Sequence, residues 1–331
     1  MFNYQGRLFT FGCSFTSYRW PTWADILGRK FDSFENWAQG GAGNQYIFNS
    51  LIEAYQRNSF TKNDTIIIMW SGTDREDRYI NGAWYTAGDV YLNRDYYSMN
   101  YLKKYVDLRG YLIRDAATIS AAKNLLDYWG VNYHFLSLMP LTTMLDDSKD
   151  YDDVIKLYKN TVTLIESSMF EVIYESNWTS QSIGHELHNI TPTDNEIDQS
   201  INNRIYQLYM SLSGKNWPNF DRYINKDFIP INPFISKELK DFKKTADQIA
   251  VNYRKQIKQL SNKLVKMTKQ STRDLHPTPA EHLKYLTKNF PEWSIDEDTV
   301  KWVKQYNSKI MSKDRFEVML NWSTKTPKNR L

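Results

Sequence analysis

Ser14 is the first residue whose setting suggests chemistry. It follows an apolar run, residues 8–11, and Gly12, and Cys13 precedes it directly. A strand that ends in a glycine and a small nucleophile often presents that side chain at the edge of a sheet. Because Cys13 and Ser14 are neighbours on an extended segment, they point to opposite sides, and only one can face a shared base. The motif alone leaves open whether either residue is a nucleophile or the segment is a structural turn.

A base and a group to orient it occur near the other end of the chain. In residues 271–282, Asp274 stands two residues before His276, and the prolines that follow predict the start of a helix. A serine nucleophile needs a base within hydrogen-bond reach, an orienting group for that base, and donors for the oxyanion. Asp274 and His276 could supply the first two. The structural alternative is that Asp274 or Thr278 only caps the helix.

Two further stretches could stabilise an oxyanion. Residues 36–47 form a glycine-rich turn leading into an expected helix, and backbone N–H groups at such a turn can hold a negatively charged oxygen. Residues 69–75, Met-Trp-Ser-Gly-Thr-Asp-Arg, come at the end of another apolar run. Ligands bind beyond the carboxyl ends of strands in open parallel sheets, where both stretches are expected. Each stretch alone is weak evidence, but together with Ser14 and His276 they indicate a catalytic site.

Short apolar runs predict the strands that would position these loops. Such runs are typical of a parallel sheet covered on both faces. The predicted strands are residues 7–12, 65–70 and 132–139, with a weaker one at 32–37. Residues 44–57 and 110–129 predict helices, and Gly130 predicts where the second one ends. Strand, helix and strand in this order predict a doubly wound α/β sheet.

Residues 141–270 differ from the rest of the chain. They are polar and rich in Lys, Asn, Asp and Tyr, with one weak strand candidate near 168–174. Residues 237–268 carry an apolar stripe at helical spacing, which predicts a long amphipathic helix. We therefore predict a mostly helical insertion at 141–270 that packs on a core formed by residues 1–140 and 271–331 and does not fold independently.

Composition limits the class of protein. The chain has 331 residues and a formal net charge of +4, too modest by itself to indicate a nucleic-acid partner. The single cysteine excludes an intramolecular disulfide and a multi-cysteine zinc site. We find no secretory signal and no apolar stretch of the ~20 residues that span a membrane, so we expect a cytoplasmic protein without a membrane partner. His185 and His188 lie close together, but without a convincing third ligand we expect no metal or other cofactor.

The order of the four stretches resembles the SGNH (GDSL-like) family of serine hydrolases. Residues 12–16, Gly-Cys-Ser-Phe-Thr, resemble the family's Gly-Asp-Ser block, with Ser14 in the nucleophile position. Residues 36–44 resemble the second block, in which Gly41 would donate its N–H to the oxyanion. This resemblance selects Ser14 as the nucleophile and implies that Cys13 is a small buried residue.

The other two blocks also have counterparts. Residues 71–74 resemble the family's Gly-x-Asn-Asp block, and residues 274–277 resemble the last block, which supplies Asp274 and His276 to the catalytic triad. One residue separates Asp274 from His276, instead of the commoner two. The resemblance says nothing about most of residues 141–270.

Two substitutions depart from the family pattern. Cys13 replaces the usual Asp, which removes a structural carboxylate but spares the nucleophile. Thr73 stands where the family has its oxyanion Asn. Either the Thr73 hydroxyl or the Asn44 amide would then complete the oxyanion hole, beside the N–H groups of Ser14 and Gly41.

The resemblance implies a fold and a reaction. The fold would be three-layer α/β/α with about five parallel strands (the flavodoxin-like SGNH hydrolase fold), carrying the insertion. Ser14 would attack an ester carbonyl, His276 would take its proton and return it to the leaving alcohol, and Asp274 would orient His276. Trp70 and Asp74 are expected to contact the substrate.

The substrate class and one alternative follow from the remaining features. Aromatic residues gather near the motifs in sequence, and aromatic faces suit sugar rings, so we expect an acetylated or otherwise acylated carbohydrate. These residues are Trp20, Trp23, Trp70, Trp84 and Tyr85.

The alternative function is that of a catalytically weak or inactive binding or structural protein. Phage-encoded proteins with a Gly-Cys-Ser-Phe-Thr start look similar to this chain, so a virion-associated role, enzymatic or not, stays open. The oligomeric state is left open.

Overall fold

The structure is a computed structural model that describes most of the chain. The described residues are 6–91, 93, 96–142, 151–165, 167–174, 185–186, 247–248, 250–256, 259, 273–312, 314–328 and 330–331. The chain divides into two compact units, the first comprising residues 1–184, 275–311 and 321–331, and the second residues 185–274 and 312–320. Much of the predicted insertion, residues 141–270, lies outside the described residues, so its mainly helical, dependent character stays a prediction.

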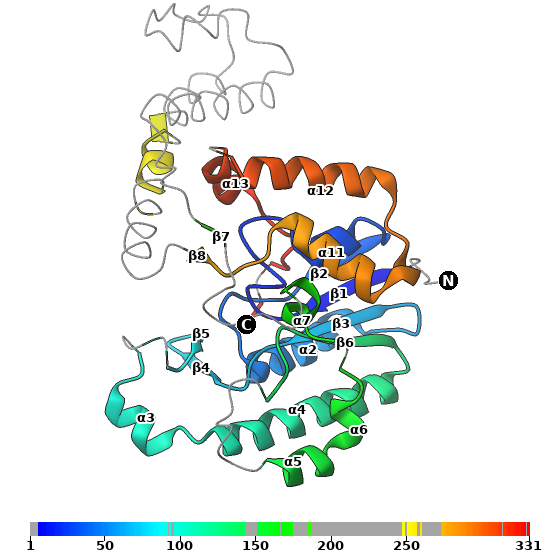
Figure 1. The fold of residues 1–331 in the computed structure, drawn as a ribbon, viewed down its shortest axis with the longest axis vertical. Coiled ribbons are helices and arrows are strands. Elements are labelled where there is room, and N and C mark those ends of the chain that lie inside the picture. Colours follow the sequence, from blue (N-terminus) through cyan, green and yellow to red (C-terminus); the bar gives the residue numbers. More distant parts are fainter. Residues whose placement is uncertain are drawn as a thin grey trace, which may run out of the picture. The chain divides into compact units, whose positions relative to one another are not determined.

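Four parallel strands form the central sheet of the first unit (Figure 1). They are β1 (Arg7–Phe11), β2 (Ser33–Asn36), β3 (Thr65–Trp70) and β6 (Asn132–Ser137), in the spatial order β2-β1-β3-β6. The four apolar runs of the sequence predict these strands within two residues at each end. Every residue of β3 is buried, as expected for a central strand covered on both faces. The mixed α/β class is confirmed.

A fifth strand is not confirmed. The described sheet has four strands, whereas the family resemblance predicts about five. Ile165 forms an isolated parallel bridge with Phe135 of β6, on the side of β6 away from β3. A fifth strand could pair with β6 at this edge of the sheet, but among the described residues only this one bridge is formed there.

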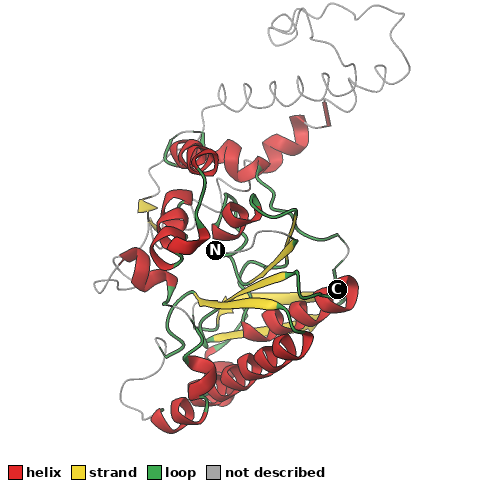
Figure 2. Cartoon of the chain, turned by 90° about the vertical axis from the view of Figure 1, so that its right-hand side faces the viewer, coloured by secondary structure: helices red, strands yellow, loops and turns green. Residues whose placement is uncertain are grey.

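Helices cover both faces of the sheet (Figures 1 and 2). On one face, α2 (Asn44–Asn58) packs on β1 and β3, and α4 (Leu108–Trp129) packs on α2. On the other face, α1 (Trp23–Gly28) contacts β2, and α11 (Pro279–Asn289) contacts α1 and α12 (Glu297–Ile310). The arrangement has three layers, and α4 ends at Gly130 in the left-handed conformation, as its sequence predicts.

Shorter elements complete the first unit. They are α3 (Met99–Tyr105), α5 (Asp152–Leu157), α6 (Lys159–Val162), α7 (Met169–Tyr174) and the 3₁₀ turn η2 (Pro291–Trp293).

In the second unit, β7 (His185–Glu186) pairs antiparallel with β8 (Arg273–Asp274). Residues 250–256 are helical and lie within the helix predicted at 237–268, most of which is outside the described residues. Along the chain, α13 (Arg315–Asn321) comes after α12 and is the last element before the C-terminus. Among the described helices, none is long and apolar enough to cross a membrane.

The strand predicted near residues 168–174 is wrong, because this segment forms helix α7. Ser168 and Glu171 form a reciprocal capping pair. The Glu171 carboxylate accepts from the Ser168 backbone N–H at 3.1 Å, and the Ser168 hydroxyl accepts from the Glu171 N–H at 3.3 Å. A Ser-x-x-Glu pattern before an apolar run is a helix-start signal, and here it overrides the strand preference of the aromatic and β-branched residues.

The hairpin of β4 (Arg75–Ile80) and β5 (Ala83–Asp89) is not predicted by the apolar pattern. Its two-residue turn is Asn81-Gly82, with φ angles of 53° and 82°. Asn-Gly favours the turn with two positive φ angles that joins antiparallel strands, so a sequence signal did exist. The hairpin comes next after β3 in the chain and therefore begins at the carboxyl end of β3, where the candidate site lies.

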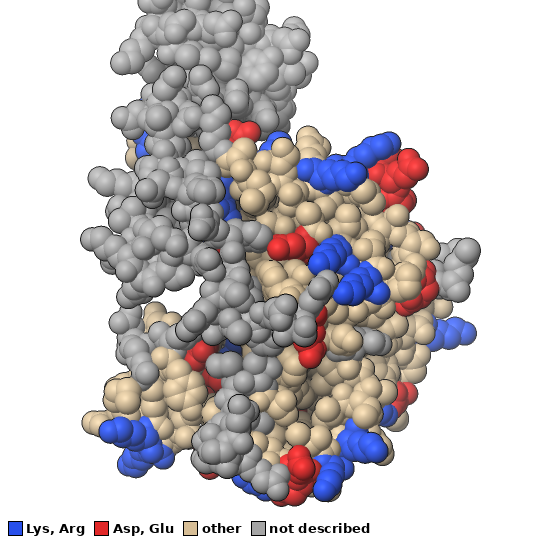
Figure 3. Space-filling view, viewed as in Figure 1, with Lys and Arg blue, Asp and Glu red and all other residues tan. Residues whose placement is uncertain are grey.

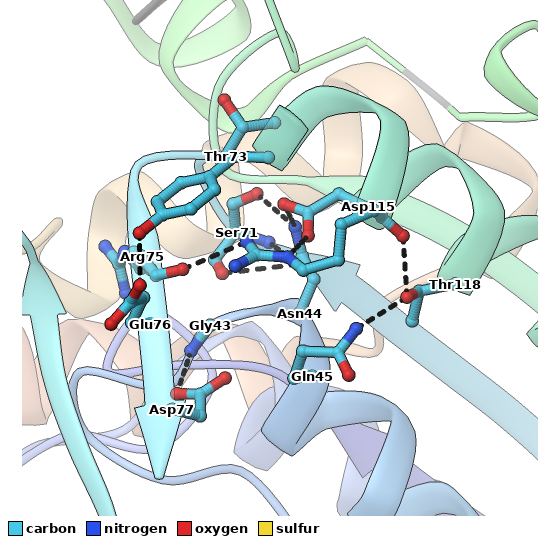
Figure 4. Close-up of polar contacts among 12 residues, drawn as sticks. Gly43, Asn44, Gln45, Ser71, Thr73, Arg75, Glu76, Asp77, Asp115 and Thr118 are labelled. Atoms are coloured by element: carbon cyan, nitrogen blue, oxygen red, sulfur yellow. Dashed lines mark hydrogen bonds and ion pairs between the residues drawn. The ribbon is translucent and has the colours of Figure 1, made fainter. Parts of the chain in front are cut away.

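Asp77 of the hairpin caps helix α2. The helix begins after Gly43, which has no side chain to accept from the first backbone N–H groups. One carboxylate oxygen of Asp77 accepts from the N–H of Gly43 at 2.8 Å (Figure 4). The other accepts from the N–H of Tyr46, also at 2.8 Å. The missing local cap is thus supplied by another element.

Candidate active site

The carboxyl ends of β1 and β3 form the topological switch point of the sheet. From β1 the chain moves outward to β2, whereas β3 is followed in the sheet by β6 on the opposite side. Crevices that bind ligands in open α/β sheets lie at this point. Residues 12–18 leave β1 here and residues 71–75 leave β3 here, as the sequence predicts.

Cys13 and Ser14 differ in their environment. Cys13 is completely buried and belongs to the hydrophobic core, which confirms the expectation of a small buried residue. Ser14 is half-buried in a tight turn, in which the N–H groups of Thr16 and Ser17 donate to the Cys13 carbonyl at 2.9 and 3.1 Å. Gly12 permits this turn, because a Cβ there would lie 2.2 Å from the Thr16 hydroxyl oxygen.

His276 lies against the loop that carries Ser14. Its imidazole stacks on Tyr18 at 3.8 Å between ring centroids and on Phe15 at 4.7 Å. The indole N–H of Trp20 donates to the Pro277 carbonyl at 2.9 Å and ties the same two segments together. These contacts place His276 beside the Ser14 loop, and the Ser14–His276 catalytic pair itself stays a prediction.

Asp274 belongs to the second unit. It is buried in β8, opposite His185 of β7. Its predicted role as the group that orients His276 stays a prediction.

His282 is a second buried histidine near His276. It lies on α11, whose start is capped by Thr278 as one of the sequence alternatives has it. The pKa of His282 is lowered to about 3, mainly by burial and also by the charge of His276, against the raising effect of Glu281. The His282 imidazole is therefore neutral at any pH at which the protein would work.

Gly41, the predicted oxyanion donor, is held by the hairpin. Its φ is +77°, and a Cβ at this position would lie 2.4 Å from the Thr86 carbonyl oxygen of β5. The Gln39 amide donates to the Thr86 hydroxyl at 3.0 Å, and that hydroxyl donates to the Gly40 carbonyl at 2.8 Å. The glycine-rich loop is therefore fixed against β5 rather than exposed on both sides.

Gly41→Ala should destabilise the protein more than Gly82→Ala. Both glycines have positive φ angles, but a Cβ at Gly82 meets nothing within 4 Å. We expect Gly82→Ala to lower the free energy of unfolding by about 1 kcal/mol from backbone strain, and Gly41→Ala by about 2 kcal/mol or more because the hairpin must also shift. Urea unfolding measures both, and equal losses would contradict the close approach.

Asn44 stands at the centre of a buried polar network (Figure 4). Its amide oxygen accepts from the Ser71 N–H at 2.9 Å, and its amide nitrogen donates to the Ser71 carbonyl at 3.1 Å and to Asp115 at 2.8 Å. Asp115 also accepts from Nε of Arg114 at 2.7 Å. Burial raises the pKa of Asp115 to about 6, opposed by the Arg114 hydrogen bond and charge. The network joins the start of α2, the end of β3 and the middle of α4.

The two side chains predicted to complete the oxyanion hole, those of Asn44 and Thr73, already donate hydrogen bonds to other groups of the protein. The two N–H bonds of the Asn44 amide serve Ser71 and Asp115. The Thr73 hydroxyl, completely buried, donates to the Leu141 carbonyl at 3.2 Å. Either residue would have to give up such a hydrogen bond to serve an oxyanion, and both roles stay predictions.

Asp74 forms a carboxyl pair with Asp89. It is 3% exposed at the end of the β3 loop, and its backbone carbonyl accepts from the Val90 N–H at 3.0 Å. The pKa of Asp74 is raised to about 7, first by burial, then by the charge of Asp89 and by a hydrogen bond that protonated Asp74 donates to the Asp89 carboxylate, against the lowering effect of Arg75. The pair closes the open end of the hairpin. The predicted substrate contact of Asp74 stays a prediction.

Asp74→Asn should flatten the pH dependence of stability. The folded pKa lies above the ordinary value of 3.8, so the folded state holds a proton that the unfolded chain has released. This stabilisation is full below about pH 4 and is lost as the pH rises through about 7. Between pH 5 and 8, we expect the wild type to lose about 2 kcal/mol more unfolding free energy than Asp74→Asn. Urea unfolding at both pH values, with the exposed Asp298→Asn as control, tests this; parallel curves would contradict it.

Most of the aromatic residues expected at the site are buried. Trp20, Trp23 and Trp70 have no exposed surface, and Trp70 packs edge-on against Phe135 in the core. They offer no ring face to a substrate in this structure, so the substrate contact of Trp70 stays a prediction. Trp84 and Tyr85, on β5 beside the glycine-rich loop, are half-buried.

One face of the molecule can be judged for charge. On the face in Figure 3, acidic and basic side chains of the described residues are interspersed. Among the described residues, no group of three or more His, Cys, Asp or Glu side chains could hold a metal ion. His188, one of the two paired histidines of the sequence, lies outside the described residues.

Comparison with known proteins adds no relative: no family model matches the sequence, and no curated protein matches it significantly. The function is therefore argued from the site.

Proposed function

We propose that this chain is a serine ester hydrolase, with Ser14 as nucleophile and His276 as general base. The observation that supports it is the stacking of His276 on Phe15 and Tyr18, which belong to the same loop as Ser14. The segments are far apart in sequence and meet at the carboxyl end of the sheet, where such folds do chemistry.

The proposed reaction has two steps. The Ser14 oxygen attacks the ester carbonyl while His276 takes the hydroxyl proton, and the proton then passes to the alcohol as the C–O bond breaks. Water, activated by His276, hydrolyses the acyl-enzyme and releases the carboxylic acid. The N–H groups of Ser14 and Gly41 would stabilise the oxyanion, with Thr73 or Asn44 as a further donor, and Asp274 would orient His276.

The proposed substrate is a short acyl ester of a carbohydrate. The support is the hairpin, which contacts the glycine-rich loop through Thr86 and carries partly exposed aromatic rings, Tyr79 at 51% and Trp84 beside it. Aromatic rings with one accessible face suit the apolar face of a sugar.

A fluorophosphonate probe tests the proposal directly. An activated serine attacks phosphorus, fluoride leaves, and His276 takes the serine proton, so the protein becomes covalently labelled. We expect mass spectrometry to locate the label on Ser14, and His276→Gln to slow the labelling strongly. Labelling elsewhere, or equal labelling of the two proteins, would contradict the mechanism.

The second candidate is an SGNH-like binding or structural protein with weak or no activity, virion-associated if phage-encoded. The observation that favours it is the commitment of Thr73 and Asn44 to Leu141, Ser71 and Asp115. No labelling and no hydrolysis of any short acyl ester by the wild type would favour this candidate.

A further inference from the structure

Two aromatic rings enclose the His276 imidazole. Tyr18 is almost parallel to it, at 14° and 3.8 Å between centroids, and Phe15 is tilted by 26° at 4.7 Å. A parallel ring at 3.8 Å occupies one face of the imidazole and leaves no room for a second ring there. Phe15 and Tyr18 therefore lie on opposite faces, and neither ring covers the edge that carries the two nitrogens, of which Nε2 has no exposed surface.

The two enclosing rings are themselves supported. Tyr18 contacts Trp20 edge-on at 4.5 Å, and Phe15 contacts Phe170 of α7 edge-on at 5.4 Å. Trp20 is completely buried and donates its indole N–H to the Pro277 carbonyl. The backbone beside His276 and the plane of its ring are thus both fixed by the Ser14 loop.

We infer that Tyr18 and Phe15 are positioning residues that hold the His276 imidazole in the plane in which it can serve Ser14. The inference rests on the proposed function. A general base must keep its nitrogen directed at the nucleophile, and a small misplacement can cost up to about 100-fold in rate. An orienting carboxylate fixes such a ring from its edge. Here stacking fixes it from both faces, which matters because Asp274 precedes His276 at a shorter spacing than the family pattern has.

Tyr18 is the better residue for the test, because it is half-buried and Phe15 belongs to the core. We expect Tyr18→Ala to lower kcat for p-nitrophenyl acetate about 10- to 100-fold with little change in KM, since the ring acts on the base rather than on the substrate. Tyr18→Phe keeps the ring without the hydroxyl and should keep most of kcat. Circular dichroism and thermal unfolding verify that both variants are folded.

A spectroscopic readout makes the test independent of turnover. In protein with ¹³C,¹⁵N-labelled histidine, the His276 ring protons should show a ring-current shift, assigned by its absence from His276→Gln. We expect Tyr18→Ala to lose much of this shift and Tyr18→Phe to keep it.

The outcomes separate the inference from the proposed function. An unshifted His276 signal in the wild type, or a folded Tyr18→Ala with wild-type kcat, overturns the inference and leaves the esterase standing. A wild type that hydrolyses no short acyl ester overturns the esterase and the inference with it.

Discussion

Ser14→Ala should reduce hydrolysis of p-nitrophenyl acetate by about 10³-fold or more. The substitution removes the nucleophile and leaves only binding and oxyanion effects, which account for the residual rate in serine hydrolases. Because Ser14 is half-buried and on a loop, we expect little change in the free energy of unfolding. Initial rates of purified wild type and variant at equal concentration measure the effect.

Two neighbouring substitutions are the controls. Cys13→Ala removes a completely buried side chain and should cost about 1 kcal/mol of stability or somewhat more, while most of the activity remains. Ser17→Ala deletes a hydroxyl from the same turn and should leave the rate within about 2-fold. Activity that depends on Cys13 and ignores Ser14 would overturn the mechanism.

Asp115→Ala should give the largest loss of stability, about 3 kcal/mol or more of unfolding free energy. The carboxylate is completely buried and accepts from Asn44 at 2.8 Å and from Arg114 at 2.7 Å. Its removal takes one acceptor from the Arg114 guanidinium and one from the Asn44 amide, and breaking one side of a buried ion pair is strongly destabilising. Urea unfolding of the purified variant measures the loss.

Asp127→Ala is the matched control on the same helix. Asp127 accepts from Lys123 at 2.5 Å and from Tyr133 at 2.8 Å, but its side chain is 46% exposed. Exposed pairs contribute little, so we expect a loss below about 1 kcal/mol. Similar losses in the two variants would mean that the buried network is not what stabilises this region.

The fold could be predicted where burial alone decides the structure. β3 is apolar because both faces are covered, and α4 is followed by a glycine because the residue after the helix has a positive φ, so both follow from sequence. Prediction failed where local hydrogen bonding decides. The capping bonds between Ser168 and Glu171 start a helix in an apolar run, and the positive φ angles of Asn81-Gly82 allow a hairpin in a polar run.

The candidate site could be predicted only in part. The Ser14 loop leaves β1 at the switch point, where strand order places it, and His276 stacks on two rings of that loop. The partners of Thr73 and Asn44 could not be foreseen, because Leu141, Ser71 and Asp115 are distant in sequence and meet these side chains only through tertiary packing. Spacing shows which residues could donate to an oxyanion, not which are already bonded.

The cap that Asp77 supplies to helix α2 has a consequence for how the protein is made. Asp77 is 31 residues beyond the Tyr46 N–H that it accepts, so during synthesis the helix start emerges from the ribosome well before its cap. We expect α2 to remain frayed at its first turn until the hairpin has formed. In the finished protein, the amide protons of Gly43 and Tyr46 should exchange with solvent together with those of β4, although the two segments share no stretch of chain.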